Sequence, residues 1–339
     1  MALPDHGQHP LSLPMLPVSQ RTGARGDTVI TTFNVENLFD LVHIPGKNDI
    51  GTGGAATPAA LDIQLTKLAL AIQVELALPE ILIVQEVDDT ALLQDLGDRV
   101  NGAAGTHYTA TSFETSDERG LDVGFLWDRQ RVKLHEAFQL TDRYVPGVSA
   151  AFGLQSPSPG REPLVGQFIV HGQLVTIVGN HLKSARGDDP LGEEPVPAMP
   201  RSALQRKAQA RVLRAFVNRL LDANPQALVL VAGDLNDIPE GQPGEGPDHP
   251  LAILAGGVGE VPLTNLITLV QEDDPFTYMV NEKRQVLDHL LVSSALFARV
   301  MGVNILHFNA GYPRELREDP TTTRRASDHD PVEGHFRFQ

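Results

Sequence analysis

The sequence predicts an α/β fold in which β-sheets are covered by helices, and three observations indicate this class. Short runs rich in Val, Ile and Leu recur along the chain, which is typical of strands buried on both faces. Segments with apolar residues at helical spacing lie between some of these runs. The chain has 339 residues, of which 41% are hydrophobic and 21% charged, so it can bury the core that such layers require.

Each apolar run predicts one strand that ends in polar residues. The run "EILIVQEV" at 80–87 is continuously apolar until Gln85 and Glu86, and "ALVLVAGDLND" at 227–237 ends in the same manner. Strands are expected at 28–39, 80–87, 121–128, 166–172, 174–182, 227–237, 285–293 and 298–308, and a final strand is expected from Pro331.

Three segments predict helices. The segment 58–76 has Pro58 near its start, 90–101 has a shorter apolar stripe, and 202–222 combines an apolar face with basic residues opposite. The Pro/Gly-rich segments 183–201 and 239–250 predict loops long enough to be functional. We expect residues 1–26, which are broken by prolines, to form a flexible tail, and residues 27–339 to form one domain.

Charge and composition narrow the classes of function. The formal net charge of −16 argues against indiscriminate binding of polyanions, although a carboxylate-rich metal pocket would itself add to the negative count. There is no cysteine, so disulfides and thiolate chemistry are excluded. No run of about 18 apolar residues predicts a membrane span, and no export signal is visible, which makes a cytoplasmic location the default expectation.

Polar residues with carboxylate, amide or imidazole groups stand in or immediately after an apolar run in six segments. Strand ends in a layered sheet protein converge on one edge. Any one of these residues alone is more typical of a turn than of a ligand. It is their joint occurrence, in order along the chain, that indicates a site. The six groups are Asn34 and Glu36; Gln85 and Glu86; Asn180, His181 and Lys183; Asp234 and Asn236; Asp288 and His289; and Ser327 to Asp330.

The ordered signatures "NVEN", "QE", "GDLND" and "SDHDP" resemble those of the endonuclease/exonuclease/phosphatase superfamily, over about residues 28–337. "RGLDVGFL" and "NHLKSARGDDP" look closest to the bacterial branch that includes secreted nucleases. The resemblance implies a four-layer α/β/β/α sandwich with two packed mixed sheets, and a site at one edge. It also implies hydrolysis of phosphate esters with Mg²⁺ or Mn²⁺, and by analogy a secreted location.

The resemblance assigns roles on the metal side and to the nucleophile. Glu86 matches the metal-binding glutamate, and Asn34 and Asp328 match residues near the same ion. Oxygen ligands of this kind suit a hard divalent cation. Asp234 matches the aspartate that orients or deprotonates the attacking water, with Asn236 beside it.

Two histidines complete the predicted catalytic set. His329 matches the histidine that binds the scissile phosphate, and Asp288 matches its carboxylate partner. His181 matches a second histidine on the leaving-group side. Within "SDHDP", Asp330 is expected to bond the backbone of a turn.

Four further residues are predicted to bind the substrate with weaker support. Arg119 and Lys183 could grip a phosphate, and a loop or solvated position is the alternative for each. Asn180 lies near the end of the apolar run at 174–182. Glu36, which is grouped with these residues, stands where some members of the superfamily carry aspartate, so outer support of the metal is an equal alternative to a direct metal role. Arg324 and Arg325 fall outside the motif and are assigned only to the rim of the site.

The predicted function is therefore a metal-dependent phosphodiesterase, above all an endonuclease that acts on DNA or RNA with little sequence specificity. A sphingomyelinase-like or small-molecule phosphodiesterase is the alternative, and a catalytically idle member that binds a phosphorylated ligand is a third. A cationic path for nucleic acid is suggested by one cluster, for which a solvated helix face is the other interpretation: Lys183, Arg186, Arg201, Arg206, Lys207, Arg211 and Arg214.

Overall fold

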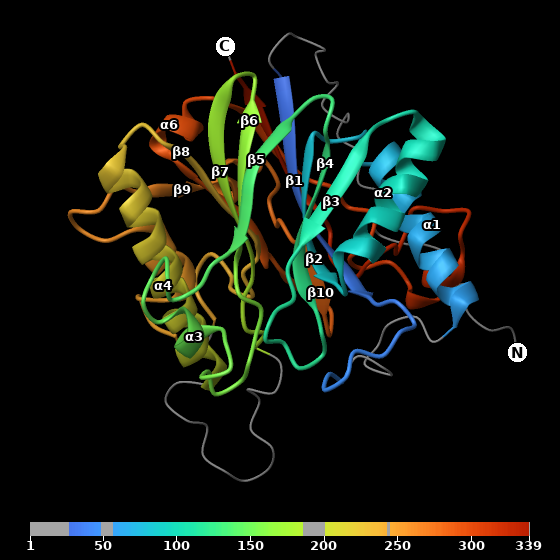
Figure 1. Cartoon of the computed structure of the whole chain (residues 1–339), viewed down its shortest axis with the longest axis horizontal. Helices are drawn as coiled ribbons and strands as arrows, with labels where there is room; N and C mark the ends of the chain where they lie inside the picture. Colours follow the sequence, from blue (N-terminus) through green and yellow to red (C-terminus); the bar gives the residue numbers. More distant parts are fainter. Residues whose placement is uncertain (1–26, 49–56, 186–200, 243–244, 339) are drawn as a thin grey trace, which may run out of the picture.

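Two six-stranded sheets pack face to face, and helices cover the outer face of each, in a computed structural model that describes residues 27–48, 57–185, 201–242 and 245–338. Figure 1 shows the two sheets side by side, with helices on either flank. The predicted α/β/β/α sandwich with mixed sheets is confirmed. The predicted N-terminal tail lies outside the described residues.

The first sheet has the strand order β13-β14-β1-β2-β4-β3. Its strands are β1 (Asp27–Leu38), β2 (Ile81–Val87), β3 (Tyr108–Ser112), β4 (Asp122–Asp128), β13 (Val300–Ile305) and β14 (Val332–Arg337). Strands β1 and β2 run parallel, and the other neighbours are antiparallel.

The second sheet has the strand order β5-β6-β7-β8-β12-β9 and also contains one parallel pair, β7 with β8. Its strands are β5 (Lys133–Gln139), β6 (Leu164–Val170), β7 (Gln173–His181), β8 (Leu228–Asp234), β9 (Leu263–Asn265) and β12 (Asp288–Ser293). A short hairpin of β10 (Tyr278–Val280) and β11 (Lys283–Gln285) precedes β12.

Helices α1 (Pro58–Val74) and α2 (Thr90–Ala104) cover the first sheet, whereas α3 (Val148–Ala151), α4 (Arg201–Ala223) and α5 (Pro250–Ala255) cover the second. The starts of α1 and α2 are capped by the side chains of Thr57 and Asp89, which accept hydrogen bonds from the first turn. The shorter elements are α6 (Ser294–Phe297), η1 (Leu266–Leu269) and η2 (Arg314–Glu318).

Alternate residues of each central strand face different apolar layers. In β2, Ile83 belongs to the core between the sheets, whereas Leu82 and Val84 pack beneath α1 and α2. Phe125 and Phe168 meet edge to face across the two sheets, with ring centroids 5.3 Å apart. Burial on both faces explains why these strands read as continuous apolar runs.

The predicted strands and helices are present, with ends displaced by a few residues. The run at 285–293 is divided, because β11 ends at Gln285 and β12 begins only at Asp288. Strands β3 and β5 were not predicted. Both lie at sheet edges and keep partly exposed polar residues, so neither forms an apolar run.

The fold brings six strand ends to one edge. The parallel strands β1, β2, β7 and β8 end there, whereas the antiparallel strands β12 and β14 begin there. The register places Asp234 beside His181 on one side and beside Asp288 on the other. This edge therefore gathers the polar residues that the sequence singled out.

Candidate active site

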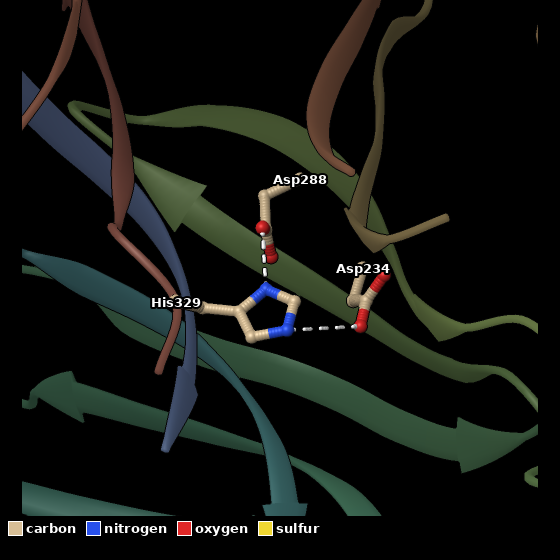
Figure 2. A group of neighbouring side chains, drawn as sticks. All are labelled: Asp234, Asp288 and His329. Atoms are coloured by element: carbon tan, nitrogen blue, oxygen red, sulfur yellow. Dashed lines mark hydrogen bonds and ion pairs between the residues drawn. The ribbon is translucent and has the colours of Figure 1, made fainter. Parts of the chain in front are cut away.

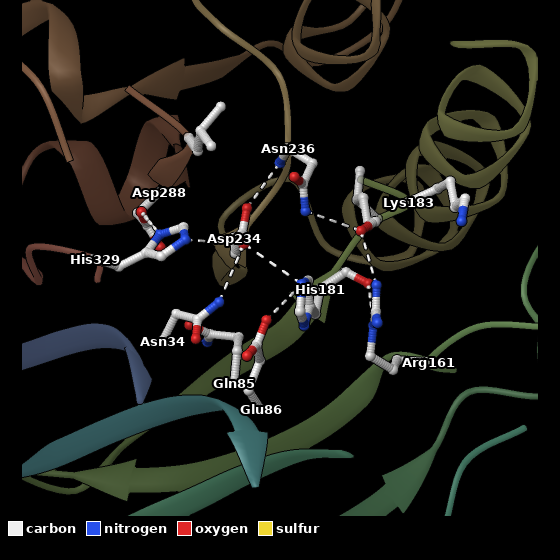
Figure 3. Close-up of polar contacts among 12 residues, drawn as sticks. Asn34, Gln85, Glu86, Arg161, His181, Lys183, Asp234, Asn236, Asp288 and His329 are labelled. Atoms are coloured by element: carbon white, nitrogen blue, oxygen red, sulfur yellow. Dashed lines mark hydrogen bonds and ion pairs between the residues drawn. The ribbon is translucent and has the colours of Figure 1, made fainter. Parts of the chain in front are cut away.

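Seven of the predicted residues lie together at this edge, and Figure 3 shows their side chains turned toward a common centre around Asp234. Three come from the first sheet or the segment before β14, and four from the second sheet or the turn after β8. They are Asn34, Glu86 and His329, and His181, Asp234, Asn236 and Asp288. The site is therefore assembled across the junction of the two sheets.

Gly233 makes the approach of β7 and β8 possible at this point. Its φ is +137°, and a Cβ there would lie 1.9 Å from the carbonyl oxygen of Asn180, so another residue cannot be accommodated without moving backbone. The next residue, Asp234, is held by the following turn, in which the Asn236 N–H donates to its Oδ1 at 2.9 Å. The position of the carboxylate is thus set by local backbone geometry.

The second carboxylate oxygen of Asp234 faces three nitrogens from three different strands or loops. Asn34 Nδ2 donates to Oδ2 at 3.2 Å, His181 Nε2 lies at 3.4 Å and His329 Nε2 at 3.9 Å. Burial raises the pKa of Asp234 to about 7, although the neighbouring His329 opposes this shift. A carboxylate with such a pKa can accept a proton near neutral pH.

His329 and Asp288 form a buried pair, drawn in Figure 2, in which Nδ1 and Oδ2 are 2.8 Å apart. Burial opposes a charged imidazole, but Asp288 outweighs it and, with Asp234 and Asp328, raises the pKa of His329 well above its ordinary value. The Tyr278 ring packs against the imidazole, with centroids 4.7 Å apart. His329 is therefore a fixed imidazolium that can stabilise negative charge on a phosphate oxygen.

Two hydroxyl groups position this pair. Thr277 Oγ1 accepts from the Asp288 N–H at 3.2 Å, and the Ser327 hydroxyl donates to the Asn34 carbonyl at 2.6 Å while accepting from the His329 N–H at 3.1 Å. The sequence did not identify Thr277, because it lies 11 residues from Asp288 in a connector without a local pattern.

Asp234, Asp288 and His329 place one ligand atom each within 4.8 Å of one another, so they too could hold a metal ion. The hydrogen-bond pattern argues against this arrangement. Nδ1 of His329 is taken by Asp288, which raises the pKa of the imidazole, so a metal at Nε2 would have to displace a proton. A cation is better accommodated on the neighbouring acidic side.

That acidic side contains Glu86, Glu36 and Asp328. Glu86 has a φ of +66°, an uncommon conformation for this residue type, and its Oε2 accepts from the Asn37 N–H at 2.9 Å. Glu36 is buried, and burial, with Asp328 and Glu86 adding to it, raises its pKa to about 6. Its buried Oε2 has no hydrogen-bond partner among the described residues. Closely spaced carboxylates with an unsatisfied oxygen fit a hard divalent cation.

His181 differs from His329 in its charge. Burial, with Arg161 and Arg119 adding to it, lowers the pKa of His181 well below its ordinary value, so this imidazole is neutral. Arg161 was not identified from the sequence. Its Nε and Nη2 donate to the carbonyl oxygens of His181 and Leu182, at 3.2 and 3.1 Å, and its Nη1 lies 3.0 Å from Asp117. Arg161 thus ties the β3–β4 loop to the end of β7.

The weaker substrate-binding predictions have different outcomes. Arg119 lies at the edge of the site, where its Nη1 donates to Asn37 Oδ1 at 3.3 Å and over a third of the side chain is exposed. Lys183 lies two residues beyond His181 and is partly exposed. Asn180 is fully buried and its amide donates to the carbonyls of Val178 and Ala232, so the structure does not support a substrate contact for it.

The predicted cationic path along α4 is wrong, and so is its alternative as a solvated helix face. Arg206 is buried against Glu245 at 2.7 Å, and Lys207 is buried beside Asp248 at 2.6 Å. Arg214 is also buried, with its guanidinium donating to the carbonyls of Leu254 and Val261. Only Arg211 is exposed, in an ion pair with Asp248, while Arg186 and the side chain of Arg201 lie outside the described residues. These cations join α4 to the loop after β8.

Asp330 has the structural role predicted for it, although it bonds a remote segment. Its Oδ1 accepts from the backbone N–H groups of residues 308–310, and its Oδ2 lies 2.8 Å from His307 Nδ1. Arg325 approaches Glu36 Oε2 at 4.0 Å, and Arg317, which was not predicted, approaches Glu36 Oε1 at 3.2 Å.

Comparison with known proteins agrees with this geometry. The model of the Endonuclease/Exonuclease/phosphatase family matches residues 29–310, whereas no curated protein sequence matches the chain. Similar solved structures include D. rerio TDP2 complexed with a single-strand DNA product, at 18% identity and a TM-score of 0.56, covering 92% of this chain and 99% of that one. An endonuclease/exonuclease/phosphatase from Bacteroides vulgatus has 14% identity and a TM-score of 0.57, covering 93% and 100%. The human Nocturnin catalytic domain has 17% identity and a TM-score of 0.54, covering 93% and 96%.

Proposed function

Because the chain belongs to the endonuclease/exonuclease/phosphatase family, we propose that it is a divalent-metal-dependent phosphodiesterase that cleaves nucleic-acid strands. The observation that carries the proposal is the arrangement around Asp234. One oxygen of its carboxylate is fixed by Asn236, and the other faces Asn34, His181 and His329. A general base, two imidazoles and a carboxylate-rich cation site stand within one cluster, which suits attack of water on phosphorus.

The metal would be held by Glu86, with Asn34 and Asp328 near the same ion. Mg²⁺ or Mn²⁺ would supply positive charge that polarises the phosphate and neutralises charge that develops on it. The chain's own residues do the rest. Asp234 takes a proton from the attacking water, and His329, held as imidazolium by Asp288, hydrogen-bonds a non-bridging phosphate oxygen.

His181 has a narrower role than a general acid. A neutral imidazole in contact with Asp234 at 3.4 Å can donate one hydrogen bond but has no spare proton to give to a leaving group. We assign His181 to orienting Asp234 through this one hydrogen bond. Asn236 fixes the carboxylate from the other direction.

A nucleic-acid substrate is supported by the similar TDP2 structure, which holds a single-strand DNA product. One observation favours a lipid phosphodiester as a second candidate. Leu41, Val42 and Phe113 expose 43%, 70% and 40% of their surface on the segments that follow β1 and β3. Lys47 ties these two segments together by donating to the carbonyls of Thr115 and Asp117. No helix within the described ranges is long and apolar enough to cross a bilayer.

The test is Asp234→Asn, which keeps the shape of the side chain and removes the base. Hydrolysis of bis(p-nitrophenyl) phosphate with Mn²⁺ should fall by about 10²–10⁴-fold, the usual contribution of a general base. Asp222→Asn, a change at an exposed aspartate of α4, is the matched control and should keep wild-type activity. An active Asp234→Asn variant with an unchanged unfolding midpoint would refute the mechanism.

Substrate class is decided by assaying a single-stranded oligodeoxynucleotide, plasmid DNA, RNA and sphingomyelin vesicles side by side, with and without EDTA. We expect EDTA-sensitive cleavage of the nucleic acids. Cleavage of sphingomyelin alone would transfer the assignment to the lipid candidate.

A further inference from the structure

We propose that Gln64 and Lys67 of α1 form a bracket, a pair of positioning residues that fixes the acidic side of the site for its divalent cation. The inference rests on the proposed function, because the cation concerned is the one that the proposed reaction requires. Neither side chain contacts the ion or the substrate. The bracket acts by holding the two chain segments that bring Glu36 and Asp328 together.

Both side chains belong to the buried face of α1, the helix that covers the first sheet (Figure 1). They are three residues apart, so they lie on the same side of the helix. Gln64 is 4% exposed and Lys67 is 1% exposed, whereas their buried neighbours Leu65 and Leu68 are apolar. Two polar groups thus occupy positions in an otherwise apolar layer.

Gln64 holds the end of β1 at the point where Glu36 leaves the regular ladder. Its Nε2 donates to the Glu36 carbonyl at 2.8 Å and to the Val35 carbonyl at 3.3 Å. Glu36 and Asn37 have φ values of +56° and +50°, and the register of β1 against β2 shifts here. Left-handed residues of this kind cost free energy and persist only where their surroundings hold them. Gln64 supplies one such contact, directly on the backbone of Glu36.

Lys67 holds the loop that leads to Asp328. Its ammonium donates to three backbone carbonyls, at 2.9 Å to Asp319, 2.7 Å to Thr322 and 2.8 Å to Arg324. An ammonium group has three N–H donors, so this loop engages all of them. Asp328 follows the last of these carbonyls by four residues. Lys67 therefore fixes the loop immediately before the segment that carries the second carboxylate.

The two segments meet on the acidic side. Burial raises the pKa of the Glu36 carboxyl, and Asp328 and Glu86 add to this shift while two nearby arginines oppose it, so the three carboxylates lie near one another. The Ser327 hydroxyl, next to Asp328, donates to the Asn34 carbonyl at 2.6 Å. Because both segments are docked on one turn of a helix, the separation of Glu36 and Asp328 is set by a rigid element.

Stability alone does not account for the bracket. Burial lowers the pKa of Lys67, with Asp319 opposing the shift, so the ammonium is buried at a cost. The Oε1 of Gln64 is also buried and has no hydrogen-bond partner in the described part of the chain. A buried amide oxygen left in this way costs free energy too. Apolar side chains would cover β1 without either cost, but only hydrogen-bond donors can hold the carbonyls of Glu36 and of the loop before Asp328.

The experiment measures the Kd for Mn²⁺ directly, from the electron paramagnetic resonance signal of the free ion. Gln64→Met removes the donor and keeps the length of the side chain. We expect it to raise the Kd about 10-fold or more, the usual loss when a group that orients a metal ligand is replaced. Lys67→Met should raise the Kd in the same way. In both variants kcat at saturating Mn²⁺ should fall less than the Kd rises, because Asp234 and His329 are held by other contacts.

Matched controls separate positioning from packing. Gln73→Met makes the same change on the same helix, at an amide that donates to the Ala69 carbonyl of α1, and should leave the Kd unchanged. Leu68→Ala removes a fully buried side chain and should lower the unfolding midpoint without changing the Kd of the folded protein. Lys67→Arg keeps a charged donor and should recover part of the affinity lost in Lys67→Met. Glu86→Gln should abolish binding, which locates the measured ion.

The outcomes distinguish the bracket from the proposed function. Equal Kd values for Gln64→Met and Gln73→Met would overturn the bracket, and this comparison stands even if Lys67→Met does not fold. A Kd raised as much by Leu68→Ala would also overturn it, because lost packing would then explain the effect. Wild-type protein that binds Mn²⁺ but cleaves no phosphodiester would refute the proposed function alone, since the affinities still decide the bracket. Wild-type protein that binds no Mn²⁺ would overturn both.

Discussion

Replacing Asp288 with asparagine should separate the contribution of the His329 pair from that of the general base. The pair has an Nδ1–Oδ2 distance of 2.8 Å and is buried, so its hydrogen bond is charge-assisted and shielded from water. A bond to a charged group contributes about 1.5–3 kcal/mol, which corresponds to roughly a 10- to 150-fold loss of kcat if it acts in the transition state. The assay is steady-state hydrolysis of bis(p-nitrophenyl) phosphate with Mn²⁺.

The pH dependence of the same variant gives an independent check. Asp288 raises the pKa of His329, so its removal lowers that pKa and the imidazolium is lost at a lower pH. The activity of Asp288→Asn relative to wild type should therefore fall as the pH rises. Asp330→Asn is the matched control, because this buried aspartate bonds backbone N–H groups and should affect unfolding more than kcat. Wild-type kcat at all pH values in Asp288→Asn would refute the assigned role of the pair.

Two further predictions concern the stability of the fold around the site. Gly233→Ala should lower the free energy of unfolding by more than about 3 kcal/mol, because the new Cβ would meet the Asn180 carbonyl oxygen at 1.9 Å in a backbone region unfavourable to alanine. Urea denaturation measures this free energy, and a variant as stable as wild type would contradict the prediction. His307 lies between Asp330 and Glu272, which raise its pKa from the ordinary 6.5 to about 9 although burial opposes this shift. The stabilisation of the fold by these two ion pairs is therefore complete below about pH 6.5 and is lost as the pH rises to about 9. The stability difference between wild type and His307→Asn should shrink by about 2–3 kcal/mol across this window, and a constant difference would exclude the pairing.

The central strands could be predicted because burial on both sides leaves a direct signature in the sequence. Ile83 faces one apolar layer and Val84 the other, so neither position tolerates a polar residue. Strand β5 gave no such signature. It is a sheet edge, and Lys133 and Glu136 are exposed within it, so its formation depends on pairing with β6 rather than on its own pattern.

The strand-end residues of the site could be predicted for a related reason. Asp234 and His181 end two buried strands that the register brings side by side, and both the apolar run and the polar residue after it are local features. Thr277 and Arg161 could not be found in this way. Each acts through contacts with backbone atoms remote in sequence, which only the folded chain brings together.

The buried cations of α4 show why the sequence alone predicted a cationic path that the fold does not present at its surface. The same burial affects how a substrate could be bound. The sequence indicates that Arg206 and Lys207 lie near one another, but not that Glu245 and Asp248 neutralise them. With these charges engaged in internal pairs, a chain of net charge −16 has little long-range attraction for a polyanion. For the proposed nucleic-acid substrate, affinity would then come from cations at the site edge itself, such as Arg119. On the proposed function, the protein would contact few phosphates and would be positioned on the strand by short-range hydrogen bonds rather than by bulk electrostatic attraction.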